Sequence, residues 1–173
     1  MQTAFKYCPK CQSSDIEIVE DRKLSCHHCG LVYYQNVATA TAVILRKKDE
    51  ILFTIRNRDP KKGMLDLPGG FVDPDETAEQ GAQRELKEEL NLEIPIENFS
   101  YFQSRFNHYE YKDILYKTCD LIFIAEFPSD TELTLEFDEI QDVKWIKLDE
   151  IKLEEIGFDS LRKAVEDYIN KQK

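Results

Sequence analysis

The stretch "GGFVDPDETAEQGAQRELKEELNL", residues 69–92, decides the fold, and it gathers three acidic residues near its end. Glu88 and Glu89 follow Glu85 by three and four positions, so on a helix these side chains lie on one side, where like charges repel. The preceding "TAEQ", from Thr77 to Gln80, fits a capping box, which predicts a helix beginning near Thr77. The stretch therefore predicts a helix with an acidic face.

Two interpretations of that acidic face follow from spacing alone. A solvated surface is the common explanation of such acidic strings. The alternative is a hard divalent cation such as magnesium, which prefers oxygen ligands and turns repulsion into coordination. Gly81 lies on the same side of the helix, where a glycine costs about 1 kcal/mol of helix stability relative to alanine. We therefore expect another group to pack against this position. An adjoining apolar stripe is expected to pack under a sheet: Ala78, Ala82, Leu86 and Leu90.

The complete string resembles the Nudix box of the Nudix hydrolases, G-x5-E-x7-R-E-U-x-E-E-x-G-U, where U is a bulky aliphatic residue. Gly70, Glu76 and the run "RELKEE" at residues 84–89 occupy the fixed positions at the same spacing. The final glycine is replaced by Asn91, which precedes Leu92. Asparagine is the next best residue for the left-handed conformation that ends a helix, so this departure changes little.

The resemblance implies an α/β/α sandwich with a mixed sheet and hydrolysis of the pyrophosphate bond of a nucleoside diphosphate derivative. It implies that Mg²⁺ or Mn²⁺ is held by the box carboxylates: Glu85, Glu88 and Glu89. Arg84 is expected in the catalytic site, where it and Glu76 orient these carboxylates through an ion pair. The Gly70 carbonyl is a further candidate ligand.

Residues outside the helix are expected to complete the site. Nudix hydrolases often recruit an acid beyond the box, and Glu139 in "DEIQDVKW" is the candidate, with an ordinary loop glutamate as the alternative. Arg56 and Arg58 in "TIRNRDP" are candidates for holding phosphate oxygens, or else exposed charges at a strand end. Gly69 and Gly70 allow the backbone to approach a substrate closely.

The N-terminal 34 residues predict a separate zinc ribbon. Two CxxC pairs, joined by alternating sequence that predicts a hairpin, supply four thiolates for tetrahedral, structural Zn²⁺: Cys8, Cys11, Cys26 and Cys29. Two unrelated thiol pairs are the alternative. His27 and His28 are interpreted as exposed loop residues, because the cysteines complete the set. A unit this small depends on metal binding for its folding.

The ribbon extends the resemblance to the NADH pyrophosphatase and ADP-ribose pyrophosphatase group of the Nudix family, whose NADH pyrophosphatases carry a four-cysteine ribbon directly before the catalytic domain. These enzymes show an S-Q-P-W-type motif downstream of the box, whereas this chain reads "YFQSRFNHYEY" at residues 101–111. The substrate therefore stays open among NADH, NAD, ADP-ribose and similar molecules. Four aromatic residues of this run are candidates for stacking on a base, with Phe102 and Tyr109 foremost: Phe102, Phe106, Tyr109 and Tyr111. The alternative is packing in a core or at an edge, which is more common for aromatic residues in strands.

Residues 35–173 predict the hydrolase domain. Five segments are strand-like: 36–47, 50–57, 101–111, 114–127 and 142–148. A C-terminal amphipathic helix is indicated by apolar residues at helical spacing: Leu161, Ala164, Val165, Tyr168 and Ile169. Asp159 or Ser160 is expected to be its N-cap. Cys119 lies in an apolar run and is predicted to be an ordinary buried thiol.

Composition limits the partners and the compartment. The chain of 173 residues carries a net charge of −11, which disfavours DNA binding and requires a metal ion between the protein and an anionic substrate. No apolar run approaches a membrane span, and the N-terminus lacks a secretion signal. Paired cysteines in this setting indicate a reducing, cytoplasmic location. A homodimer is possible.

A second hypothesis belongs to another class of protein. An inactive Nudix domain could sense a nucleotide while the ribbon docks a partner. Such a module usually has a damaged box, whereas the acidic positions are complete in this chain. The sequence therefore favours the enzyme.

Overall fold

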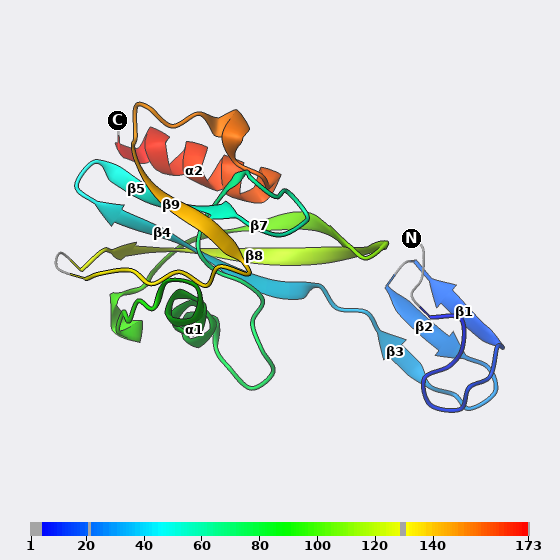
Figure 1. The fold of residues 1–173 in the computed structure, drawn as a ribbon. Coiled ribbons are helices and arrows are strands. Elements are labelled where there is room, and N and C mark those ends of the chain that lie inside the picture. The colour runs from blue at the N-terminus through cyan, green and yellow to red at the C-terminus, as the bar shows by residue number, and fades with distance from the viewer. Residues whose placement is uncertain (1–4, 21, 129–130, 173) are drawn as a thin grey trace. The chain divides into compact units, whose positions relative to one another are not determined.

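The computed structural model describes residues 5–20, 22–128 and 131–172 of the chain (Figure 1). Contacts between residues divide the chain into two units. One contains the chain up to Val37 together with His108–Tyr116; the other contains Ala38–Asn107 and the chain from Lys117 onward. Among the described residues, no helix has the length and apolar character that a bilayer span requires.

The first unit is built on a three-stranded antiparallel sheet in the order β1-β2-β3. Its strands are β1 (Ile16–Val19), β2 (Lys23–Cys26) and β3 (Val32–Tyr34). The central strand alternates, so that Leu24 and Cys26 are buried while Lys23 and Ser25 are half-buried. The hairpin predicted between the two cysteine pairs is therefore present as β1 and β2.

A six-stranded mixed sheet in the order β6-β5-β4-β8-β7, with β9 also paired to β5, belongs mainly to the second unit; the parts of β7 and β8 within His108–Tyr116 belong to the first. Its strands are β4 (Ala38–Lys47), β5 (Glu50–Arg56), β6 (Leu65–Asp66), β7 (Ser100–Tyr111), β8 (Ile114–Glu126) and β9 (Ile140–Lys147). Strands β4 and β8 run parallel, whereas β5 is antiparallel to β4, β6 and β9. The five predicted strands are confirmed; β6 and two 3₁₀ turns, η1 (Ile96–Asn98) and η2 (Leu153–Glu155), are additional.

Two helices cover opposite faces of this sheet, α1 (Ala78–Leu90) and α2 (Asp159–Gln172) (Figure 1). The α1 stripe predicted from sequence packs into a core that includes Val43, Leu45 and Leu52 of the sheet. The α2 stripe is buried at Leu161, Ala164, Val165 and Tyr168. The α/β/α sandwich is thereby confirmed.

Both predicted ends of α1 are confirmed. Thr77 is the N-cap, and its side chain and that of Gln80 complete a reciprocal capping box. Asn91 ends the helix in the left-handed conformation, with φ 52° and ψ 33°. The prediction for α2 was wrong by one residue, because Asp159 and Ser160 already lie in its first turn.

The prediction that Cys119 is buried was wrong, since its side chain is half-buried. Alternation along β8 instead turns Thr118 and Asp120 into the interior. The buried Asp120 carboxylate accepts hydrogen bonds of 2.6 Å from the hydroxyls of Thr118 and Ser160. These two hydrogen bonds offset the free-energy cost of burying the carboxylate.

Candidate active site and zinc site

The three box carboxylates differ in exposure although they share one side of α1. The side chain of Glu88 is 59% exposed, whereas that of Glu85 is 14% exposed. Glu89 is partly buried, and its Oε2 accepts a 2.9 Å hydrogen bond from the Gly69 amide. The helix therefore presents one acid to solvent and holds two against the protein.

Arg84 lies among these acids and binds several of them. Its Nη2 is 2.7 Å from Glu76 Oε1, and its Nη1 is 2.9 Å from Glu85 Oε1 and 3.0 Å from Glu88 Oε2. Hydrogen bonding to Arg84 lowers the pKa of the Glu76 carboxyl, and the Asp73 amide, which donates to it at 2.6 Å, lowers it further. The ion pair expected between Arg84 and Glu76 is present.

The glycine loop before α1 is packed too closely for side chains. Gly69 has φ +143°, and a Cβ there would overlap the Thr41 carbonyl. A Cβ on Gly70 would overlap the Glu85 carboxylate. The Gly70 carbonyl already accepts a 2.7 Å hydrogen bond from the Thr41 amide. On the helix itself, Gly81 makes room for a carboxylate of the loop, because a Cβ there would lie 3.0 Å from Oε1 of Glu76.

The structure brings Glu139 close to the box acids from a distant part of the sequence. Its backbone carbonyl accepts a 2.7 Å hydrogen bond from the Asn57 amide, which fixes it at the end of β5. Its charge raises the pKa values of both Glu85 and Glu89. Its own carboxylate forms an ion pair with Arg58. Three acids from two segments therefore interact electrostatically.

Their mutual repulsion makes this group of acids suitable for a cation. Burial raises the pKa of the Glu89 carboxyl well above its usual value; the Gly69 amide offsets part of this, and the charges of Glu85, Asp66 and Glu139 raise it further. Burial likewise raises the pKa of Glu85, and Arg84 opposes that rise. A hard divalent cation would favour the charged forms of such carboxylates, so the residues fit the ion that the box implies.

Arg56 and Arg58 have different surroundings. Arg56 is directed into the protein, where its Nη1 lies 2.6 Å from Asp66 Oδ2 and its Nε donates to the Pro60 carbonyl at 2.7 Å. Arg58 is half-exposed beside Glu139. Sequence reasoning missed Asp66, although one signal was available: a single acid between Leu65 and Leu67, directly before the glycine loop.

The aromatic candidates divide between the two units of the chain. Phe102 packs edge-on against Tyr168 of α2, with ring centroids 6.0 Å apart, and Lys171 Nζ lies 4.3 Å from its ring centroid. Tyr109 belongs to the first unit, where its ring lies 6.3 Å from that of Tyr111. These contacts match the packing alternative for Phe102.

The zinc-type site lies in the first unit. The sulfur atoms of four cysteines lie within 4.8 Å of one another: Cys8, Cys11, Cys26 and Cys29. Among the described residues, no other group of histidine, cysteine or acidic side chains is as compact. The Cys8–Cys29 and Cys11–Cys26 sulfurs are 3.7 and 3.6 Å apart. A tetrahedral Zn–S bond of about 2.3 Å requires S···S distances of about 3.8 Å, so the set fits zinc. His27 and His28 are exposed, as predicted.

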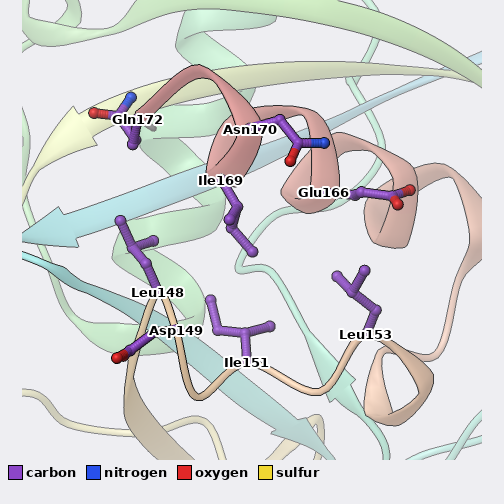
Figure 2. Close-up of a pocket in the computed structure, with 8 residues that line it drawn as sticks. All are labelled: Leu148, Asp149, Ile151, Leu153, Glu166, Ile169, Asn170 and Gln172. Atoms are coloured by element: carbon purple, nitrogen blue, oxygen red, sulfur yellow. The ribbon is translucent and has the colours of Figure 1, made fainter.

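A pocket of about 540 Å³ lies elsewhere in the second unit, between α2 and the segment that follows β9 (Figure 2). Leu148, Ile151, Leu153 and Ile169 form its apolar lining. Among the described residues that line it, the charged ones are the acids Asp149 and Glu166. Such a lining repels a diphosphate, and it includes none of the box acids.

Comparison with known proteins identifies the family. The model of the NUDIX domain matches residues 35–168, so the chain belongs to the NUDIX family. A curated relative, the NAD-capped RNA hydrolase NudC of Haemophilus influenzae (strain PittEE), is 31% identical over 148 residues, which cover 84% of this chain and 52% of the relative. The chain thus spans about half the length of the curated relatives it matches.

Solved structures share the fold. A NUDIX hydrolase from Nitrosomonas europaea matches with a TM-score of 0.73 at 23% identity, covering 97% of this chain and 92% of that one. The NUDIX domain of Shewanella oneidensis NrtR, in complex with ADP ribose, matches with a TM-score of 0.64 at 22% identity, covering 81% and 91% of the two chains. At these identities the likeness concerns the fold.

Proposed function

We propose that this protein hydrolyses the pyrophosphate bond of a nucleoside diphosphate derivative such as NADH, NAD or ADP-ribose. The observation that carries the proposal is the 3.0 Å hydrogen bond from the Glu136 amide to the Glu89 carbonyl, which ties the turn that carries Glu139 to the box helix, so that acids from two distant segments interact. Residues 35–173 would form the hydrolase domain and residues 1–34 its zinc ribbon.

Each residue of the proposed site has a role that its contacts support. Glu85, Glu88, Glu89 and Glu139 would hold magnesium or manganese, which when bound would neutralise the diphosphate and acidify a bound water. Arg84 would orient the carboxylates through its bonds to Glu76, Glu85 and Glu88.

The reaction itself needs one proton acceptor. The oxygen of water would attack phosphorus, the bridging P–O bond would break, and the proton of the water would pass to a carboxylate. Glu89 and Glu139 are the candidates; the raised pKa of Glu89 lets this carboxylate accept a proton more readily at neutral pH. Among the arginines, Arg58 is better placed than Arg56 to meet phosphate oxygens, because it is half-exposed.

Similar proteins support this substrate class by their names. The Haemophilus relative is an NAD-capped RNA hydrolase, and a bifunctional NMN adenylyltransferase/ADP ribose pyrophosphatase from Francisella tularensis shares the fold at 25% identity with a TM-score of 0.60. We place this activity in the cytoplasm on the basis of the paired thiols, with nucleotides and not DNA as partners.

A panel assay tests the proposal. NADH, NAD, ADP-ribose, a nucleoside diphosphate sugar and a nucleoside triphosphate would be incubated with the protein and magnesium or manganese, and the products separated by chromatography. We expect two monophosphate products from at least one dinucleotide or ADP-ribose substrate. Binding of ADP-ribose without turnover of any compound would instead indicate a nucleotide-sensing module.

A further inference from the structure

An exposed phenylalanine stands next to the proposed site. Phe137 lies in the turn that leads into β9, and 66% of its surface is exposed. It is two residues before Glu139, which interacts with the box acids. A single exposed aromatic side chain is ordinary, so exposure alone indicates no function. Its position and the rigidity of its turn carry the argument.

The turn that presents Phe137 is fixed by hydrogen bonds on both sides. The Glu136 amide donates to the Glu89 carbonyl at 3.0 Å, which ties the turn to the end of α1. The Asn57 side-chain amide donates to the Phe137 carbonyl at 2.6 Å, and the Asn57 backbone amide donates to the Glu139 carbonyl at 2.7 Å. Phe137 is therefore held between the segment that carries Glu89 and the segment that carries Arg58.

The groups of the proposed site match the diphosphate part of a nucleotide. A divalent cation held by the acids, together with the half-exposed Arg58, would bind the diphosphate. A base attached to that diphosphate needs a flat apolar surface within a few ångströms, and aromatic side chains provide one for any base. Because the backbone of the turn is already fixed, only the side-chain torsions of Phe137 lose freedom when such a stack forms.

We propose that Phe137 is a stacking surface for an aromatic base of the substrate. The inference rests on the proposed function and adds to it a subsite for the nucleobase or nicotinamide. It also assigns base stacking to a residue outside the aromatic candidates of β7, of which Phe102 is engaged with Tyr168 and Lys171 of α2.

Steady-state kinetics of Phe137 variants test this inference. With NADH or ADP-ribose, whichever the parent hydrolyses faster, Phe137→Ala should raise KM about tenfold, the size expected for one lost stack. Its kcat should change less than about twofold, because the stack forms equally in the ground state and the transition state. Phe137→Leu should resemble Phe137→Ala, whereas Phe137→Trp should restore the parental KM.

A matched control is Tyr101→Ala. Tyr101 is 60% exposed on β7, which is separated from β5 by β4 and β8 in the sheet order, and its removal should leave KM unchanged. A parental KM in Phe137→Ala, or an equal rise in Phe137→Leu and Phe137→Trp, would refute the stacking subsite while leaving the hydrolase intact. A parent that hydrolyses no member of the substrate panel would refute the proposed function and this inference together.

Discussion

The thiol cluster of the first unit and the carboxylate cluster of the second are built on opposite plans. Four cysteine sulfurs lie within 4.8 Å of one another, and these four side chains alone form the compact ligand group. The box acids instead surround Arg84, and they range from the 59% exposed Glu88 to the partly buried Glu89. Four thiolates close a tetrahedral site, whereas magnesium bound by carboxylates keeps positions for water and phosphate.

The two clusters are expected to affect the stability of their units in different ways. A closed thiolate site adds its metal-binding free energy to folding. In the carboxylate site, burial first and mutual repulsion second raise the pKa values of Glu85 and Glu89. Arg84 opposes the rise at Glu85, and the Gly69 amide opposes it at Glu89. We therefore expect metal loss to unfold the first unit and to inactivate the second while it stays folded.

The largest effect is expected in the ribbon. Cys26→Ser should lower zinc content from about one per chain to near zero and unfold the first unit, because zinc binding contributes on the order of 10 kcal/mol in such small folds. Metal analysis with amide hydrogen exchange would measure both effects. Cys119→Ser is the control and should retain zinc. Full zinc content in Cys26→Ser would show that the site is not a four-thiolate site.

The next largest effect concerns turnover. Glu89→Gln should lower kcat about 100-fold or more under saturating magnesium, because a lost carboxylate removes cation binding and a possible proton acceptor. Circular dichroism should show an unchanged fold. Glu93→Gln, beyond the end of α1, is the control and should keep parental activity. If the activity of Glu89→Gln stays within about twofold of the parent, the acidic face is a solvated surface without a catalytic role.

The stability of the second unit should depend on pH through the same side chain. The folded-state pKa of Glu89 lies well above its ordinary value of 4.5, so its contribution is fully favourable below pH 4.5 and is lost as pH rises through the folded pKa. Without added magnesium, the parent should become progressively less stable than Glu89→Gln over that rise. Denaturant unfolding at several pH values would measure the gap, and added magnesium should narrow it. A gap independent of pH would contradict the raised pKa.

The smallest effect is expected from Arg84→Lys. Lysine keeps the charge but cannot reproduce the bonds that the guanidinium makes to Glu76, Glu85 and Glu88 together. With Arg84 27% exposed, we expect a loss of about 1 kcal/mol in the free energy of unfolding. Chemical denaturation without added magnesium provides the measurement. A variant as stable as the parent would mean that Arg84 does not compensate the repulsion.

Local spacing in the sequence determined much of this protein. The capping box at Thr77, the left-handed end at Asn91 and the apolar stripe of α1 all depend on residues within a few turns of one another. The same holds for the cysteine pairs, whose turns place ligands locally. The three box carboxylates share one side of α1 because helical periodicity fixes their directions.

Residue spacing did not show which distant segments lie beside the box helix: the family resemblance named Glu139 as a candidate, and the tertiary structure ties its turn to that helix. The β5–β9 register skips Gln141 between the pairs Ile55↔Asp142 and Arg56↔Ile140, an irregularity that no local pattern announces. Glu139, just before β9, is bonded to Asn57, just after β5. Strand pairing joins residues more than 80 positions apart, and its register depends on the whole sheet and not on the sequence near either strand.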